Sequence, residues 1–331
     1  MKFKEAAGID VSKKTIDAHL HLGGKHKEFN NTAKGFKAFV KWVEINTGLS
    51  IHQVLICFEH TGLYSLPLAS FLTKAGICFS MVPAMQIKRS LGIVRGKNDK
   101  IDALRIADYA YLRRNNIESY QMPSAHILKI QKLLSLRERM VRQRAGYKTT
   151  LKEYKAILTR SENQTLFTAQ DQMIKQLTRQ IDKIEDEIES IIKEDKVMSK
   201  LFKLVTSVKG IGPIVGAHLL VVTNCFSCFD DSRKFACYAG IAPFEKQSGT
   251  SLKSKARVSH YANKRIKALL SLAAFSAIKS DPELKAYYKR RIEKGKSKMS
   301  TINIVRNKIV HRVFAVVKRG IPHVPLHKHA A

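Results

Sequence analysis

The feature that most constrains the fold is a pair of apolar runs that each end in a carboxylate. Ala6-Ala-Gly-Ile closes on Asp10, and Val54-Leu-Ile-Cys-Phe closes on Glu59. Apolar runs of this length are typical of buried strands. A carboxylate at the end of a buried strand costs free energy unless another group compensates its charge. We therefore expect Asp10 and Glu59 to need such a partner.

Two further acids, Asp99 and Asp102, lie three residues apart in the basic stretch Arg95-Gly-Lys-Asn-Asp-Lys-Ile-Asp-Ala103. They would open a helix and share one of its faces. Helix capping is the alternative, because Asp followed by an acid three residues later is also an ordinary helix start. Together with Asp10 and Glu59 these acids would repel one another, and a divalent metal held by hard oxygen ligands is the usual remedy. The sequence thus predicts an acidic metal site.

The rest of the chain is strongly cationic. Its 331 residues carry a formal net charge of +32, and 44% of them are hydrophobic. Such an excess indicates a polyanionic partner, with nucleic acid as the first candidate and an anionic membrane as the second. No run of about 18 apolar residues and no signal-peptide pattern is found, so we expect a soluble, cytoplasmic protein without a membrane partner.

The five cysteines do not form a disulfide scaffold, which fits a reducing compartment. Cys225-Phe-Ser-Cys228, with Cys237 nearby, suggests zinc as one interpretation. No second pair follows, so packed thiols are the expected outcome.

Residues 1–120 are expected to form the first domain, of the α/β class. We predict antiparallel strands over 4–11, 15–22 and 25–29, then a helix capped by Thr32. The strand ending at Glu59, a helix to about Lys74, a strand over 77–82 and a helix opened by Pro83 would follow. A meander followed by alternating helices and strands favours a mixed sheet, compatible with a ribonuclease-H-like core.

Residues 121–198 are expected to form an antiparallel, coiled-coil helical hairpin, broken near Ser161-Glu-Asn-Gln164. It would pack on itself or pair with another protomer. Its basic helix would contact a phosphate backbone or simply face solvent. The second helix carries a heptad seam, formed by Ile174, Leu177, Ile181, Ile184, Ile188 and Ile191.

Residues 199–331 are expected to form a mainly helical domain. Val208-Lys-Gly-Ile-Gly-Pro-Ile-Val215 resembles a helix-hairpin-helix turn, in which Lys209, Gly210 and Gly212 would approach a phosphate. A tight packing turn is the alternative.

Further along, Gln247-Ser-Gly-Thr-Ser-Leu-Lys-Ser-Lys-Ala-Arg257 interleaves hydroxyl groups with cations, which indicates a loop able to hold a scissile phosphate. The helices expected over 263–279 and 301–318 combine apolar stripes with basic faces.

Taken in order, these motifs resemble one family over nearly the whole chain. The chain is similar to the bacterial insertion-sequence transposases that join a RuvC-like DEDD domain to a C-terminal serine domain, the bridge-RNA-guided recombinases, which have a pilin-inversion recombinase as a relative. The motifs that carry the resemblance are Gly8-Ile-Asp10, Glu59-His-Thr-Gly62, Asn98-Asp-Lys-Ile-Asp-Ala103, Gly210-Ile-Gly-Pro213, Tyr238-Ala-Gly-Ile-Ala-Pro243 and Ser248-Gly-Thr-Ser251.

The resemblance implies specific roles for these residues. Ser248 would be the nucleophile, with Ser251 as the second choice, and the tetrad would hold Mg²⁺ or Mn²⁺. One stretch departs from the pattern, since Ser259-His-Tyr-Ala-Asn263 stands where many relatives have Ser-Lys-x-Gly-Asn. The acidic tetrad consists of Asp10, Glu59, Asp99 and Asp102, and the expected nucleic-acid contacts are Arg95, Lys97, Lys209, Gly210, Gly212, Lys253, Lys255 and Arg257.

The resemblance also implies partners. A noncoding bridge RNA would pair with donor and target DNA duplexes, and a dimer would assemble into a tetramer on the nucleoid. The heptad seam is a candidate for oligomerisation. Two other functions stay open: a metal-dependent, structure-specific nuclease such as a junction resolvase, which would use the acids without Ser248, and a nucleic-acid packaging protein, in which the acids are structural.

Overall fold

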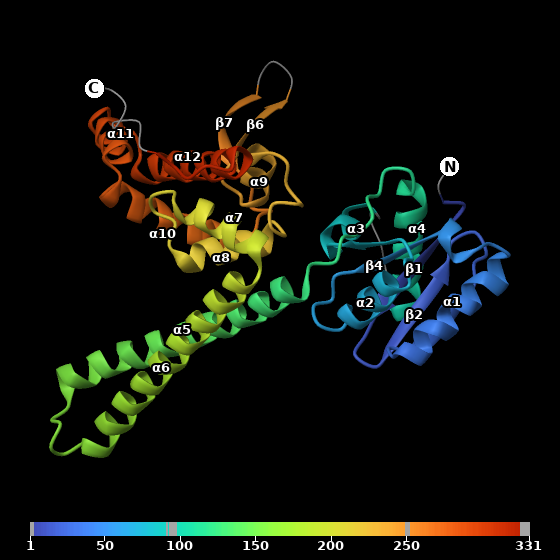
Figure 1. Cartoon of the computed structure of the whole chain (residues 1–331), viewed down its shortest axis with the longest axis horizontal. Coiled ribbons are helices and arrows are strands. Elements are labelled where there is room, and N and C mark those ends of the chain that lie inside the picture. Colours follow the sequence, from blue (N-terminus) through green and yellow to red (C-terminus); the bar gives the residue numbers. More distant parts are fainter. Residues whose placement is uncertain (1–2, 91, 93–97, 249–251, 325–331) are drawn as a thin grey trace. The chain divides into compact units, whose positions relative to one another are not determined.

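A computed structural model describes residues 3–90, 92, 98–248 and 252–324 (Figure 1). Contacts divide the chain into two units, Met1–Met122 and Pro123–Ala331. Each unit has hydrophobic cores of its own. The predicted division into three domains stays a prediction.

The first unit contains a five-stranded mixed sheet in the order β3-β2-β1-β4-β5. β1 pairs antiparallel with β2 and parallel with β4; β2 pairs antiparallel with β3, and β4 parallel with β5. This confirms the predicted mixed sheet and is consistent with a ribonuclease-H-like arrangement. The strands are β1 (Glu5–Val11), β2 (Thr15–Leu20), β3 (His26–Asn30), β4 (Val54–Glu59) and β5 (Phe79–Val82).

Helices cover both faces of this sheet. Ala7 and Ile9 of β1 belong to the core that includes Phe36 and Phe39 of α1, whereas Ala6 of β1 belongs to the core that includes Ile106 of α4. The Thr32 side chain accepts a hydrogen bond from the backbone N–H of Gly35, as predicted for the cap of α1. The helices of this unit are α1 (Ala33–Thr47), α2 (Leu66–Lys74), α3 (Ala84–Ser90) and α4 (Asp99–Arg113), with a 3-10 turn at Ile51–Gln53.

Helix α4 lies against β1 at Gly8. A Cβ atom added to Gly8 would lie 2.1 Å from the backbone nitrogen of Ala107 and 2.3 Å from the carbonyl oxygen of Ala103. Only a residue without a side chain allows this approach of two backbones. Small residues on both sides therefore fix the helix on the strand.

The second unit begins with the predicted helical hairpin, α5 (Ala125–Ile157) and α6 (Gln164–Glu194). The two helices contact each other (Figure 1). Ile184, Ile188 and Ile191 of the heptad seam share one buried core with Ile127 and Ile130 of α5. The hairpin therefore packs on itself. Pairing of this seam with another protomer stays a prediction, although Ile184, Ile188 and Ile191 already have apolar partners within the chain.

Most of the remaining chain is helical, as expected. Asn263 caps α10 through a bond from the N–H of Ile266, and α12 begins three residues before the prediction. The helices are α7 (Lys196–Thr206), α8 (Pro213–Val222), α9 (Ser232–Tyr238), α10 (Lys264–Ser280), α11 (Pro282–Glu293) and α12 (Lys298–Arg319).

The predicted phosphate-holding loop is instead built on two antiparallel strands, β6 (Pro243–Ser248) and β7 (Leu252–Val258). This correction has a physical reason. The segment has few apolar residues, but two antiparallel strands pair through their backbone N–H and C=O groups, which needs no apolar side chains.

Arg265 joins α10 to the base of the hairpin. Its Nε atom lies 2.8 Å from Oε2 of Glu138, and its Nη2 donates to the carbonyl of Leu134 at 3.1 Å. Nη2 also lies 3.3 Å from Nε2 of His218. Burial and the nearby Arg265 charge lower the pKa of His218 to about 3, so its neutral ring accepts this bond.

We predict that Gly8→Ala destabilises the protein, because the new methyl group forces α4 off β1. Overpacking of this kind costs about 1–3 kcal/mol. Gly23→Ala is the matched control in the same unit, because a Cβ there would meet only the Leu20 Cβ at 3.9 Å. Urea unfolding followed by circular dichroism measures both. A Gly8→Ala protein as stable as Gly23→Ala would contradict the close packing.

Candidate active site

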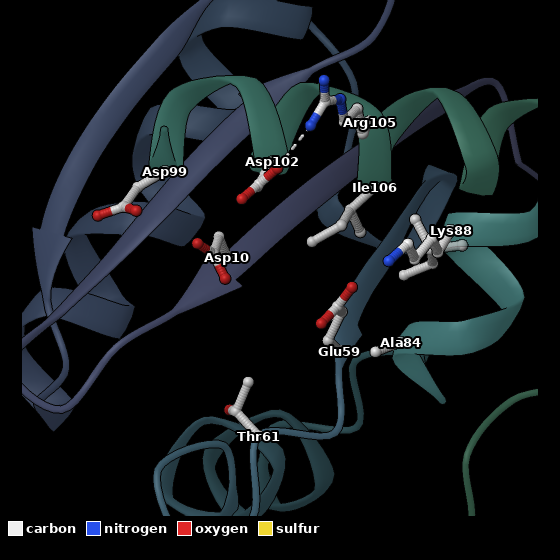
Figure 2. A pocket seen from close by; sticks show the side chains of 10 residues that line it. Asp10, Glu59, Thr61, Ala84, Lys88, Asp99, Asp102, Arg105 and Ile106 are labelled. Carbon is white, nitrogen blue, oxygen red and sulfur yellow. Dashed lines mark hydrogen bonds and ion pairs between the residues drawn. The ribbon is translucent and has the colours of Figure 1, made fainter. Parts of the chain in front are cut away.

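One cavity of about 480 Å³ is lined by all four predicted acids, Asp10, Glu59, Asp99 and Asp102. Asp10 and Glu59 reach it because β1 and β4 are parallel neighbours with Ile9 opposite Phe58, so both strands deliver the next residue to the same edge. Figure 2 shows Asp10, Asp99 and Asp102 where β1 meets the first turns of α4, and Glu59 entering from β4. The acids distant in sequence thus share one pocket.

The cap of α4 is Asn98, not an aspartate. Its Oδ1 accepts the backbone N–H of Ile101 at 2.7 Å. Asp99 and Asp102 lie in the first turn, and their carboxylates are not used for capping. Capping by Asp99 is therefore wrong, while two acids in the first turn still favour the start of a helix. Both residues line the pocket.

Negative charge accumulates in this pocket. Burial raises the pKa of Asp10, and the charges of Asp99, Asp102 and Asp17 raise it further. Asp17 lies directly opposite Asp10 on β2 and pairs with Nε2 of His26 at 2.8 Å. The pocket therefore favours a bound cation, which would relieve this repulsion.

Two cations of the chain also line the pocket. Nη1 of Arg105 lies 3.0 Å from Oδ1 of Asp102, and Lys88 lies across from it on α3 (Figure 2). Sequence reasoning missed both residues. The spacing of Arg105, three residues after Asp102 on one helix face, could have indicated an ion pair between them. No sequence pattern indicated that Lys88 would line the pocket.

The pocket is an open acidic surface rather than a closed cage. In the part of the chain that the structure describes, no three His, Cys, Asp or Glu side chains are grouped so as to hold one metal ion. An open set still suits Mg²⁺, which binds through one or two carboxylates and takes its other ligands from water and substrate phosphates.

The remaining predicted residues are in the second unit or outside the description. Ser248 ends β6, with its backbone opposite Leu252 of β7. Lys253 and Lys255 lie on β7, and Arg257 is exposed near its end. The residues outside the described ranges are Arg95, Lys97 and Ser251.

The predicted helix-hairpin-helix turn does join two helices, α7 and α8. Gly210 has φ +94, and a Cβ there would lie 2.4 Å from the carbonyl oxygen of Ala273 on α10. The packing-turn alternative therefore explains Gly210. Lys209 is exposed, and Gly212 caps α8 at an open position, so their phosphate contacts stay a prediction.

The cysteines carry no disulfide in this structure, and all five are free thiols. Burial raises the pKa of Cys57 to about 12 and that of Cys225 to about 11, so both are protonated at neutral pH. This agrees with packed thiols at these two positions, while Cys228 is exposed.

Comparisons with known proteins give the pocket its context. Residues 7–161 match a family described as "Transposase", and residues 202–289 match one described as "Transposase IS116/IS110/IS902 family". The two matches together cover more than two thirds of the chain. The acidic pocket is therefore that of a DNA transposase.

Individual relatives match the chain over different lengths. The chain is 28% identical to the pilin gene-inverting protein of Moraxella lacunata over 330 residues, covering 96% of this chain and 97% of that protein. It is 30% identical over 120 residues to an IS110 protein of Streptomyces coelicolor, covering 36% of this chain and 29% of the other. The chain belongs to the IS110/IS116 family of insertion-element transposases. No described helix is both long and apolar enough to cross a membrane.

We predict that Asp10→Asn makes the metal-free protein more stable at pH 7. Because the pKa of Asp10 is raised in the folded state, its ionisation opposes folding once the pH exceeds the ordinary value of 3.8. The advantage of the amide should shrink as the pH falls below that value. Thermal unfolding in chelator across pH tests this.

Asp108→Asn is the control, because Asp108 is on the same helix but pairs with Nδ1 of His21 at 2.7 Å. It should not gain stability at pH 7. An Asp10→Asn protein no more stable than wild type at pH 7 would show that the repulsion has no energetic consequence.

Proposed function

We propose that this transposase cuts and rejoins DNA strands through a serine-linked protein–DNA intermediate, with divalent ions bound at the acidic pocket. The observation that carries the proposal is the convergence of Asp10, Glu59, Asp99 and Asp102 on one cavity of a transposase. Hydrolytic or transesterifying attack on a phosphodiester needs compensation of negative charge at both the entering and leaving oxygens, and two metal ions about 4 Å apart supply it.

The acids have distinct positions for this task. Asp10 and Glu59 are fixed by a sheet edge, whereas Asp99 and Asp102 are on the first turn of a helix. Rigid strands and a packed helix hold ligands better than loops. Arg105 holds Asp102 in the metal-free protein and would release it, in whole or in part, when a stronger cation competes.

Ser248 is proposed as the nucleophile, with Ser251 as the second choice. Its Oγ attacks phosphorus and loses its proton to a base; a new P–O bond forms as the bond to the leaving deoxyribose oxygen breaks. The phosphodiester is conserved as a protein–DNA ester, so a strand hydroxyl can reverse the attack and rejoin DNA without ATP. Lys253, Lys255 and Arg257 on the adjoining strand would neutralise the phosphate.

Mg²⁺ or Mn²⁺ fits the pocket by its donor set, which consists of hard carboxylate oxygens without sulfur or imidazole. The second candidate function is a metal-dependent nuclease. It is favoured by one observation, that all four acids belong to the first unit and need nothing from Ser248 to form the pocket.

We further propose that a noncoding RNA guides the choice of DNA site, and that a dimer assembles into a tetramer on donor and target duplexes. The net charge of +32 supports a polyanionic partner of this kind. Delegating sequence choice to base pairing leaves the protein to bind backbones.

We predict that Ser248→Ala abolishes a covalent protein–DNA adduct formed on insertion-element ends with Mg²⁺, because the attacking oxygen is gone. Denaturing gels of labelled DNA detect the adduct. Ser251→Ala, three residues further along the chain, is the control and should retain the adduct. An adduct that survives Ser248→Ala would overturn the assignment, and free DNA ends from an unmodified protein would support the nuclease instead.

We predict that the protein purified from its native host carries one enriched noncoding RNA encoded with its element. Sequencing of the bound RNA measures this, with RNA from a mock purification as the control. A bound population that reflects only total cellular RNA would contradict guidance while leaving the serine chemistry untouched.

A further inference from the structure

The second unit contains another cavity, of about 540 Å³, between α12 and the segment that leads into α9. It is separate from the acidic pocket, and none of the predicted site residues lines it. Its wall combines three aromatic rings with a small polar group. The residues that the argument uses are Phe226, Phe229, Phe314, Ser232, His311 and Lys318.

The aromatic wall is packed against the hydrophobic core of the second unit. Phe226 meets Phe314 edge-on with ring centroids 5.3 Å apart, and Phe229 meets Phe235 in the same way at 5.3 Å. Phe235 is fully buried and anchors the cluster in the core. The phenylalanine side chains that line the cavity therefore form an apolar wall, which suits a planar ligand.

Backbone strain is concentrated beside this wall. Asn224, Cys225 and Phe226 have φ values of +47, +54 and +64, and no other non-glycine residue in the described ranges has a positive φ. Three successive left-handed residues cost free energy, and such strain gathers at binding and switch sites. Here Oγ1 of Thr223 accepts the N–H of Phe226 at 2.9 Å and helps hold the segment.

A chain of hydrogen bonds connects the polar residues that line the cavity. Ser232, which is 8% exposed, donates its hydroxyl proton to Oδ1 of Asp231 at 3.2 Å. Nδ1 of His311 lies 2.8 Å from the same hydroxyl. The serine hydroxyl thus links the Asp231 carboxylate to the His311 ring. Whichever tautomer is present, Nε2 of the ring is left as a second hydrogen-bonding group.

We propose that this cavity binds an unpaired nucleobase of the nucleic acid on which the transposase acts. A base has a flat face for the phenylalanine rings and polar edge atoms that can hydrogen-bond to Nε2 of His311. Two carboxylates, Asp230 and Asp231, line the cavity beside Lys318. Oδ2 of Asp230 lies 3.9 Å from Nζ of Lys234, and Oδ1 of Asp231 accepts the backbone N–H of Arg233, so both acids have partners and Lys318 supplies positive charge for the attached backbone. A paired base cannot enter, because its polar edge and both faces are already occupied.

This proposal goes beyond the cutting and joining chemistry and depends on neither Ser248 nor the acidic tetrad. The bound base would belong to a single-stranded segment of DNA or of RNA. The two share the recognised chemistry, so the experiment compares them directly.

The test uses the full chain and short oligonucleotides that carry one 2-aminopurine, whose fluorescence falls when it stacks on a ring. We expect quenching on binding to single-stranded DNA, to single-stranded RNA or to both, and none with the paired duplex. Phe226→Gly removes the ring at a position whose φ favours glycine. It should weaken binding and raise the apparent Kd by about tenfold.

Asn224→Gly is the matched control, because it relieves the same kind of strain two residues away and leaves the ring; it should bind as wild type. His311→Gln, an exposed position, should also weaken binding of the amino-bearing probe without lowering the melting temperature. Equal quenching by the duplex would overturn the proposal. Unchanged binding by both Phe226→Gly and His311→Gln would do the same.

Discussion

The contact between the backbones of α4 and β1 at Gly8 is the constraint on which the acidic pocket depends. The positions of Ala103 and Ala107 leave no space for a side chain on Gly8, so the close contact fixes the position of α4 on the sheet. In this position the first turn of α4 lies near the end of β1, where Asp10 is located. A larger residue at this contact would move Asp99 and Asp102 together, because they belong to one rigid helix. The packing of Gly8 against Ala103 and Ala107 therefore determines where the carboxylates of α4 lie.

The pocket that results is energetically unfavourable when empty of cations. The raised pKa of Asp10 records the burial and mutual repulsion of its carboxylate, and Arg105 and Lys88 offset part of the negative charge. A site of this kind would give up stability in exchange for ion affinity, which is a familiar compromise at active sites. The net charge of +32 suits a polyanionic partner, and in the proposed function the acids would hold the ions that assist attack on its phosphates.

Sequence reasoning succeeded where local signals and tertiary structure agree. The apolar runs ending at Asp10 and Glu59, and the Thr32 cap, mark their own elements. It missed β6 and β7, although Leu252, Ser254, Ala256 and Val258 of β7 alternate with the three basic residues between them, because serine and alanine make only a weak apolar pattern. The sequence also could not show which helix packs against the heptad seam, because the same isoleucines could pack against α5 or against another chain. The sequence offered Asp99 as a possible N-cap of α4, but the adjacent Asn98 is the cap. Both residue types are good N-caps, so the sequence could not distinguish between them. The cavity beside Phe226 depends on left-handed backbone at non-glycine residues, which no sequence rule indicates.

The central claim is that the four acids form one ion-binding site. The most direct measurement is the anomalous scattering of Mn²⁺ in crystals of the protein bound to its DNA. The account predicts a Mn²⁺ peak within coordination distance of Asp10 and of at least one acid of α4, with Arg105 displaced from Asp102. A structure with DNA and Mn²⁺ present, no peak in this pocket and the Arg105–Asp102 pair intact would contradict it.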